Sequence, residues 1–169
     1  VTLTGSKIYN ADNIVLASEI TSISGTVGSE TLSITGQGTT SNANVGSNLL
    51  VSNGTLAMDD GIGAASNYII GGNITFNINT RPLNIDASRT VNGTTTVQSS
   101  DSTLTNLVNS EDLVLSGFGI AAQSNAGDDV LITDISSFSL SNGSSGLASN
   151  YTLTGGTHLV DITSTSPYI

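Results

Sequence analysis

Cysteine and tryptophan are absent from the 169-residue chain, proline occurs twice, and only 9% of the residues are charged. Without cysteine there are no disulfides and no thiolate metal ligands. Ordinary soluble domains contain about 25% charged residues, so solubility here must come from the hydroxyl and amide groups of Ser, Thr and Asn. The absence of cysteine suits a bacterial secreted protein but does not by itself decide the compartment.

The few charges are mostly negative, with 13 acidic against 3 basic side chains and a formal net charge of -10. Such a chain is repelled by nucleic acid phosphates and by anionic membrane surfaces. We find neither an apolar run of 18 or more residues nor a signal-like amino terminus. The sequence therefore predicts no nucleic acid partner, no membrane insertion and no targeting segment within this stretch.

An internal repeat is the most informative feature that is present. The segment from Ala65 to Gly72 returns as Ala148 to Gly155, a shift of 83 positions. Further matches lie at offsets between about 81 and 84, and these are Ser6-Lys7 with Ser88-Arg89, Ser29-Glu30 with Ser110-Glu111, Gly36 and Gly38 with Gly117 and Gly119, and Asn44 and Gly46 with Asn125 and Gly127. This period exceeds the solenoid range of roughly 20 to 50 residues.

Each copy is long enough to bury a small core of its own. We predict a first repeat domain at 1–80, a second at 81–164, and the start of a following repeat or linker at 165–169. The short join from Asn79 to Leu83 contains a proline that restricts φ, which favours copies stacked end to end. The missing initiating Met leads us to expect a piece of a longer array.

Alternating apolar residues and frequent turn residues predict an all-β fold. Ile74, Phe76 and Ile78 alternate with polar residues, as in a half-buried strand. Asn-Gly pairs at 53–54, 92–93 and 142–143 are typical of turns. One short helical turn per copy is expected, near 61–66 and 145–149. The pattern leaves open a β-sandwich or a β-grasp-like sheet in each of the two domains of about 80 residues.

The residues do not assemble a recognisable catalytic set, and we predict that the chain is not an enzyme. His158 is the only histidine, and the repeat aligns it with Ile74, an apolar strand residue in the first copy. It is interpreted as a strand-rim residue, because no cysteine could pair with it and the other copy lacks it. Ser-His-Asp chemistry would need this same residue.

Acidic pairs beside turns are the candidates for a cofactor site. Oxygen-rich turns are typical of calcium sites, and the candidate ligands are Asp59, Asp60, Asp128 and Asp129. None matches the EF-hand spacing, and the two pairs fall at different places in the repeat. Solvated turns are the alternative, so no cofactor is predicted, with calcium kept as a hypothesis.

Tyr68 and Tyr151 occupy matching positions after Asn67 and Asn150. A tyrosine repeated in this way is typical of a core anchor whose hydroxyl reaches the rim, with stacking on a ligand as the alternative.

These motifs, in this order, resemble the YDG and MBG repeats of large secreted bacterial adhesins of the filamentous haemagglutinin-like, two-partner secretion class. The opening of such repeats, Ser-Lys-x-Tyr-Asp-Gly, matches residues 6–11 and 88–93, although neither copy keeps the full Tyr-Asp-Gly. The signature positions are Tyr9, Asn44, Gly46, Asn67 and Tyr68 in the first copy, and Asn125, Gly127, Asn150 and Tyr151 in the second. The match covers nearly the whole chain.

The resemblance implies an exported structural or stalk segment at the cell surface of a Gram-negative bacterium, which supports cell adhesion or attachment to a biofilm matrix. Expected partners are neighbouring repeats of the same chain. The alternative is a module that binds a glycan or a host or matrix protein and is stabilised by calcium.

Overall fold

The computed structural model of the chain describes residues 1–165 and is all-β. Its only helical segments in that range are four 3-10 turns of three residues each. The all-β prediction is confirmed. Within the same range, no helix is long and apolar enough to cross a membrane. The segment 165–169, predicted to open a linker or a further repeat, lies outside the described residues except for Thr165.

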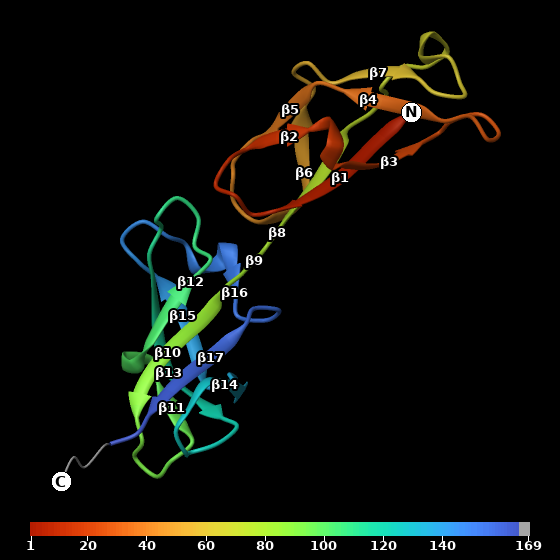
Figure 1. Cartoon of the computed structure of the whole chain (residues 1–169). Coiled ribbons are helices and arrows are strands. Elements are labelled where there is room, and N and C mark those ends of the chain that lie inside the picture. The colour runs from red at the N-terminus through yellow and green to blue at the C-terminus, as the bar shows by residue number, and fades with distance from the viewer. Residues whose placement is uncertain (166–169) are drawn as a thin grey trace. The chain divides into compact units, whose positions relative to one another are not determined.

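The chain divides into two compact units, unit 1 (Val1–Arg81) and unit 2 (Pro82–Ile169). Unit 1 contains a six-stranded sheet in the order β2-β5-β6-β8-β1-β3, and a two-stranded sheet of β4 and β7 (Figure 1). Its elements are β1 (Thr2–Ile8), β2 (Ile14–Leu16), η1 (Ala17–Glu19), β3 (Ile20–Ser24), β4 (Leu32–Thr35), β5 (Gln37–Thr40), β6 (Gly46–Ser52), β7 (Ala57–Asp60), η2 (Ala65–Asn67) and β8 (Ile74–Asn79).

Unit 2 contains a sheet in the order β11-β13-β14-β17-β10-β12, with β15 also paired to β13. Leu83 donates its backbone N–H to the carbonyl of Thr152, beside the short pair of β9 and β16. Strand β9 (Arg81–Pro82) contains the last residue of unit 1 and the first of unit 2. The other elements of unit 2 are β10 (Asn84–Thr90), β11 (Thr96–Gln98), η3 (Ser99–Asp101), β12 (Ser102–Thr105), β13 (Leu113–Ala121), β14 (Gly127–Asp134), β15 (Phe138–Asn142), η4 (Ala148–Asn150), β16 (Tyr151–Thr152) and β17 (His158–Thr163).

The main sheets of the two units have the same strand order. From one edge of the sheet to the other, the order in unit 1 is β2, β5, β6, β8, β1 and β3. The corresponding strands in unit 2 are β11, β13, β14, β17, β10 and β12. Strand β13 of unit 2 corresponds to both β4 and β5 of unit 1. It continues through Gly117, whereas the matching residue of unit 1, Gly36, separates β4 from β5. Both glycines have positive φ, +82° and +86°, and a Cβ there would collide with the carbonyl oxygen of Thr55 or Ser137. Glycine is therefore required at this point in both units.

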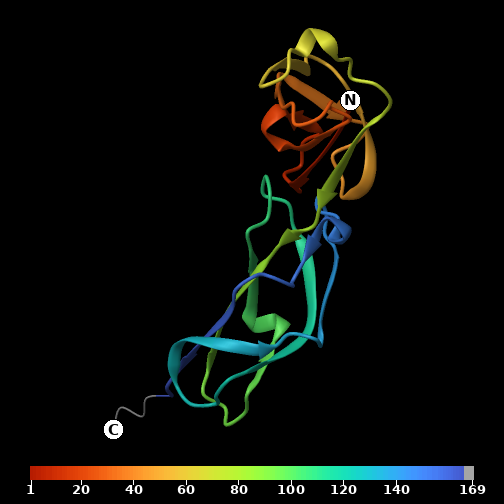
Figure 2. The same cartoon turned by 90° about the vertical axis from the view of Figure 1, so that its right-hand side faces the viewer.

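Each main sheet must be strongly curled. Strands β2 and β3 lie at opposite edges of the six-stranded sheet, yet only the three residues of η1 separate them. A flat sheet would place these edges about 24 Å apart, at about 4.8 Å per strand. The four peptide units from Leu16 to Ile20 can span at most about 14 Å. In unit 2, β11 and β12 likewise lie at opposite edges of the sheet and are separated only by η3, and the curl of this sheet is visible in Figure 2.

The 3-10 turns differ in part from the expectation of one per copy. Turns η2 and η4 lie close to the expected segments, but each unit has a second turn, η1 or η3, at the corner between the two sheet edges. The sequence does not indicate this corner, because it is required by the curl of the sheet and not by a local helix signal.

The cores lie inside the curled sheets. Ile74, Phe76 and Ile78 are 2%, 1% and 1% exposed, which confirms the predicted half-buried strand. Core side chains of unit 1 also include Leu3, Val15, Val51 and Leu56, and those of unit 2 include Ile85, Ala87, Val97, Ala121, Val130, Ile132, Phe138, Val160 and Ile162.

The two cores differ in the residues at one matching cross-strand pair. Gly5 is paired with Phe76 in unit 1, whereas Ala87 is paired with Val160 in unit 2. A Cβ on Gly5 would lie 2.9 Å from the Phe76 ring and would collide with the carbonyl oxygen of Glu19. Glycine is therefore required at position 5, because the Glu19 carbonyl and the Phe76 ring occupy the space that a Cβ would take.

A turn with positive φ follows the first long strand of each unit. Ala11 has φ of 64° and the matching Gly93 has φ of 79°. An L-residue with a Cβ is strained in this region by about 1–2 kcal/mol. Glycine at the end of the Tyr-Asp-Gly pattern is thus explained by the positive φ of this position, where unit 1 has Ala11 instead.

We expect Ala11→Gly to stabilise unit 1 by about 0.5–1 kcal/mol, since relief of strain exceeds the entropy that glycine adds to the unfolded chain. Differential scanning calorimetry should show an upward shift of the unit 1 transition by a few degrees. Gly93→Ala is the matched control and should lower the unit 2 transition, because a Cβ there has no neighbour within 4 Å and only the backbone is strained. A downward shift for Ala11→Gly would contradict this account.

Candidate functional site

A buried basic side chain anchors the turn after the first strand of unit 1. Lys7 lies in β1 and is 8% exposed. Its Nζ donates to Oδ1 of Asp12 at 2.6 Å, to the carbonyl of Asp12 at 3.0 Å and to the carbonyl of Ile14 at 2.6 Å. The ammonium group is therefore paired and saturated with acceptors, as burial of a charge requires.

Arg89 anchors the corresponding turn of unit 2 from the matching position in β10. Its guanidinium donates from Nη1 to Oδ1 of Asn92 at 2.7 Å and from Nη2 to the carbonyl of Thr94 at 2.6 Å. Both units thus use the basic residue of the opening motif to hold the next turn. Within the described residues, Nε of Arg89 is buried without a partner.

The hydrogen bonds of the Lys7 anchor in unit 1 also change the pKa of Asp12. Burial alone would raise the pKa of its carboxyl, but the hydrogen bond from Lys7 and the backbone N–H of Ile14 outweigh burial and lower the pKa below its usual value of 3.8. The carboxylate form is therefore the one that the anchor stabilises.

The signature residue Tyr9 lies in the core of unit 1, where it is 4% exposed. Its backbone N–H donates to the carbonyl of Asn79 at 2.9 Å, and Val91 makes the same bond to Thr163 in unit 2. This backbone bond extends the pairing of the first and last long strands in both units.

A tyrosine–glutamate pair anchors a loop in each unit. In unit 1 the hydroxyl of Tyr68 accepts the backbone N–H of Val27 at 3.0 Å and donates to the carboxylate of Glu30. The hydrogen bond to Glu30 raises the pKa of Tyr68 above its usual value of 10.0. We call this arrangement, and its counterpart in unit 2, the Tyr–Glu anchor.

The counterpart is more deeply buried. Tyr151 is 5% exposed, its hydroxyl accepts the N–H of Val108 at 3.1 Å, and it donates to Oε2 of Glu111 at 2.7 Å. The hydroxyls of both tyrosines are thus used by the chain itself, at the rim of the core. Asn67 and Asn150, which precede them, end η2 and η4, and Asn150 is buried whereas Asn67 is exposed.

The signature glycines open the strands that carry a bulge. Gly46 pairs with Ile78 and Gly127 with Ile162, and in each case the register shifts just after the glycine. Asn44 donates its backbone N–H to Oδ1 of Asn42 at 2.9 Å, and the backbone carbonyl of Asn125 accepts a hydrogen bond from Nε2 of Gln123 at 3.2 Å, so both signature asparagines belong to the preceding loop.

Each bulge is held from the neighbouring strand. Asn48 (φ 53°) donates its N–H to Oδ1 of Asn77 at 2.8 Å, and Asp129 (φ 51°) donates to Oδ1 of Asp161 at 2.8 Å. This role of Asn77 and Asp161 was not predicted from the sequence. Their positions on the repeated last strand were a usable signal, because a polar residue recurs there between buried ones.

The four calcium candidates are separated between the two units. Asp59 and Asp60 lie in β7, and their Oδ1 atoms accept the N–H of Asp60 and Ala65 at 2.9 and 2.7 Å. Asp128 and Asp129 lie in the β14 bulge. Within residues 1–165, no group of three or more His, Cys, Asp or Glu side chains is placed to hold a metal ion.

Asp112 is a further anchor, a role that was not predicted from the sequence. Its carboxylate accepts the N–H of Ser144 at 2.9 Å and of Ser145 at 2.7 Å, and also both serine hydroxyls. These bonds, led by the Ser144 N–H, hold the pKa of Asp112 well below its usual range. They tie the loop after β15 to the start of β13.

His158 begins β17 and is buried opposite Ile85. Its Nε2 lies 2.8 Å from the carbonyl of Leu153, which assigns the proton to Nε2. Within the described residues, Nδ1 has no partner. The surroundings are those of a core residue, with the apolar strand residue of unit 1 replaced by an imidazole.

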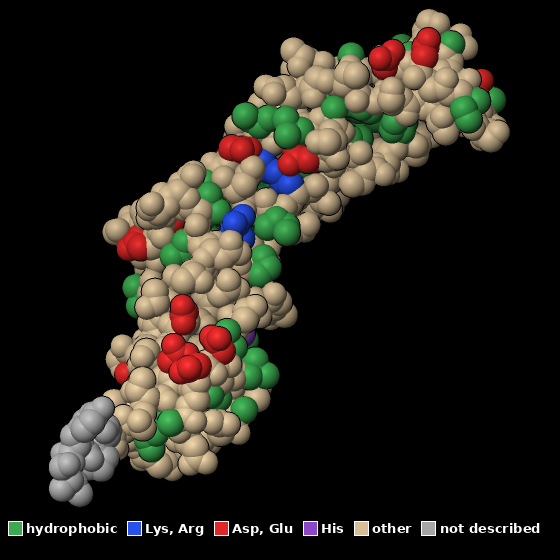
Figure 3. All heavy atoms as spheres, in the orientation of Figure 1, with side chains coloured by type: hydrophobic (Ala, Val, Ile, Leu, Met, Phe, Trp, Pro, Cys, Tyr) green, Lys and Arg blue, Asp and Glu red, His purple; other side chains and the backbone are tan. Residues whose placement is uncertain are grey.

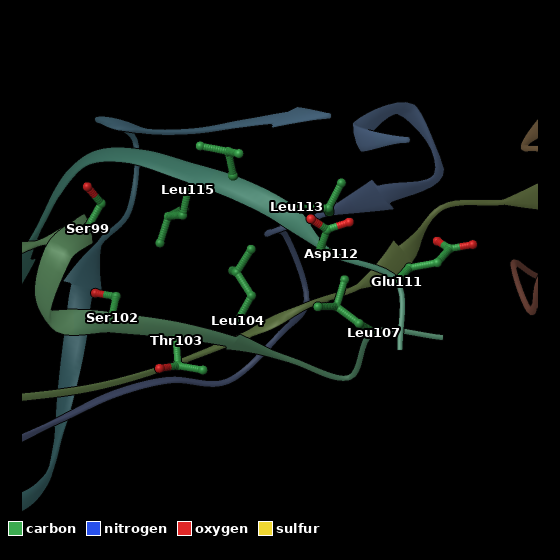
Figure 4. Close-up of a pocket in the computed structure, with 10 residues that line it drawn as sticks. Ser99, Ser102, Thr103, Leu104, Leu107, Glu111, Asp112, Leu113 and Leu115 are labelled. Atoms are coloured by element: carbon green, nitrogen blue, oxygen red, sulfur yellow. The ribbon is translucent and has the colours of Figure 1, made fainter. Parts of the chain in front are cut away.

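An apolar groove lies along one side of unit 2, between β12 and the first half of β13. Its volume is about 460 Å³. Leu104 and Leu115 point into it from the two strands, Leu107 lies at one end close to Glu111 and Asp112, and Ser99 lies towards the other end (Figure 4). On the face shown in Figure 3, backbone and uncharged polar side chains cover most of the surface, with apolar and acidic side chains between them.

Comparison of the chain with protein-family models, with curated proteins and with solved structures found no match.

The buried Tyr–Glu anchor should contribute measurably to stability. We expect Tyr151→Phe to lower the free energy of unfolding of unit 2 by about 1–2 kcal/mol, because the Val108 N–H and the Glu111 carboxylate lose a partner in a partly buried site. Denaturant titration of the whole chain, followed by circular dichroism, measures this change.

Tyr68→Phe is the matched variant and should destabilise unit 1 less, since Tyr68 is more exposed than Tyr151. If Tyr151→Phe unfolds at the wild-type denaturant concentration, the anchor contributes nothing and Tyr151 acts through its ring alone.

Proposed function

We propose that the chain is a structural segment of the stalk of a large bacterial surface adhesin, made of two tandem homologous β domains joined end to end. In this role the segment holds a distal adhesive region away from the cell and supports adhesion or attachment to a biofilm matrix. It acts without catalysis, outside the outer membrane of a Gram-negative cell, and its partners are neighbouring repeats.

One observation carries the proposal: the residues that recur in both copies serve internal anchoring. The basic residue of the opening motif holds the following turn, the repeated tyrosine and glutamate hold a loop, and the repeated glycines meet a strand break or a bulge. Selection for a ligand site shared by the copies would instead place repeated side chains at the surface with free polar groups. A repeated scaffold is what a spacer needs.

The surface composition supports the same role. Hydroxyl and amide groups provide solubility with only 9% charged residues. The formal net charge of -10 also makes copies of the chain repel one another, which disfavours side-by-side association of neighbouring stalks.

A second candidate function rests on the groove of unit 2. Four leucines, Leu104, Leu107, Leu113 and Leu115, line a groove that ends at two acidic residues. This lining favours a protein segment over a glycan, because sugar sites usually rely on aromatic rings and polar groups. Thr26 of unit 1 occupies the position that matches Leu107, so this part of the groove lining is apolar in unit 2 and polar in unit 1.

Small-angle X-ray scattering of the fragment tests the stalk proposal. A single compact particle of this length would have a radius of gyration of about 15 Å, whereas two domains placed end to end should give a clearly larger value and an extended distance distribution. A value near that of the compact particle would overturn the arrangement. Adding millimolar calcium should change neither the scattering nor the melting temperature; a rise in melting temperature would instead favour the calcium-stabilised alternative.

The binding alternative predicts that wild-type protein binds at least one matrix protein on an immobilised panel, and that Leu107→Thr weakens this binding several-fold by making the groove resemble that of unit 1. Leu131→Thr is the control, since Leu131 is exposed on β14 outside the groove. Equal binding by both variants, or none by the wild type, would remove this candidate.

A further inference from the structure

The first and last long strands of each unit are neighbours and run parallel. In unit 1, β1 and β8 are paired from Thr4 opposite Thr75 to Ile8 opposite Asn79, which makes five paired positions. In unit 2, β10 and β17 are paired from Ile85 opposite His158 to Thr90 opposite Thr163, which makes six. Figures 1 and 2 both show β10 and β17 side by side. We call β1 with β8, and β10 with β17, the terminal strand pairs.

Parallel pairing determines how tension acts on a unit. The chain enters unit 1 at the start of β1 and leaves it at the end of β8, and in a parallel pair these points lie at opposite ends of the ladder. Tension along the chain therefore pulls the two strands past each other along their own axis. All the backbone hydrogen bonds between them must then yield together. In an antiparallel pair the same tension would open the bonds one after another.

The surrounding sheet reinforces the terminal strand pair. Strand β8 lies between β6 and β1, and β1 lies between β8 and β3, so neither strand is at an edge. Sliding one strand would also pull Leu3, Phe76 and Ile78 out of the core, where each is at most 1% exposed. Apolar side chains of this size resist transfer to water by about 1.5–3 kcal/mol each.

Additional bonds lengthen both ladders. The N–H of Tyr9 donates to the carbonyl of Asn79 at 2.9 Å beyond the last paired position of unit 1. In unit 2, Val91 makes the same bond to Thr163, and the hydroxyl of Thr163 donates to the carbonyl of Arg89 at 3.3 Å. The basic anchors Lys7 and Arg89 lie on the same strands and hold the turn at the end of the ladder.

We propose that the terminal strand pair is a mechanical clamp, so that each unit transmits tension between its ends without unfolding. The function that follows is resistance to pulling, such as a surface-bound cell meets in flow. The biological use of this property rests on the proposed stalk function, whereas the clamp itself rests on the strand geometry alone.

Single-molecule force spectroscopy tests the clamp, and the cysteine-free sequence allows a unique attachment point. The full chain is held at its amino terminus and at a single cysteine, introduced either by Asn79→Cys or by Asn73→Cys. Both asparagines are exposed, and they lie at the end of β8 and just before its start. Asn79→Cys loads the strand pair in shear, whereas Asn73→Cys places both attachment points at the same end of the ladder and peels it open.

The two variants release nearly equal lengths of chain, about 250–290 Å when extended, so the same unfolding event is compared in both. We expect the rupture force in the Asn79→Cys geometry to exceed that in the Asn73→Cys geometry by about three- to five-fold, because five paired positions yield together instead of singly. Thermal unfolding of each variant, with the wild type as reference, checks that both substitutions leave unit 1 folded.

Equal rupture forces in the two geometries, with both variants folded, would overturn the clamp. This result is independent of the scattering experiment. A compact fragment with a large force ratio would remove the stalk and keep the clamp, and an extended fragment with equal forces would do the reverse.

Discussion

The parallel pairing of the first and last long strands is the constraint on which the rest of each unit depends. It brings together residues about 70 positions apart, such as Thr4 and Thr75, at the interior of the sheet. The basic anchor projects from the first strand of the pair, and the residue that holds the bulge projects from the last strand. Because both strands are interior, the remaining strands add outwards on either side, and the sheet curls until three-residue 3-10 turns can join its edges.

The two units show which features of this arrangement tolerate change. Lys7 becomes Arg89, Phe76 with Gly5 becomes Val160 with Ala87, and Ile74 becomes His158. In each case the position keeps its role of turn anchor, packing pair or core residue while the chemistry changes. The backbone features are kept more strictly, with positive φ after the first strand, at the strand break and at the bulge in both units. The architecture therefore depends on backbone geometry more than on particular side chains.

Anchoring and mechanics are connected in this fold. Turns and loops held by charge-assisted hydrogen bonds, such as those from Lys7 to Asp12 and from Tyr151 to Glu111, limit fraying at the ends of the strands. A strand pair that does not fray presents its whole ladder to an applied force. The repeated side chains would in this way serve the same purpose as the strand pairing, which is a unit that stays folded while the chain is pulled.

The sequence by itself determined the features that depend on neighbouring residues. Alternation around Phe76 identified a buried strand, the recurrence of residues 65–72 identified the repeat, and glycine and asparagine identified several turns, because each of these signals is local. The partners of the anchors were decided only by the tertiary structure. Glu30 and Tyr68 are 38 residues apart, and no pattern in the sequence near either residue indicates that they are in contact. The same holds for the parallel register, for the groove and for the edge-to-edge corners at η1 and η3. Strand order depends on how the whole sheet closes around its core, and alternation carries no information about that order.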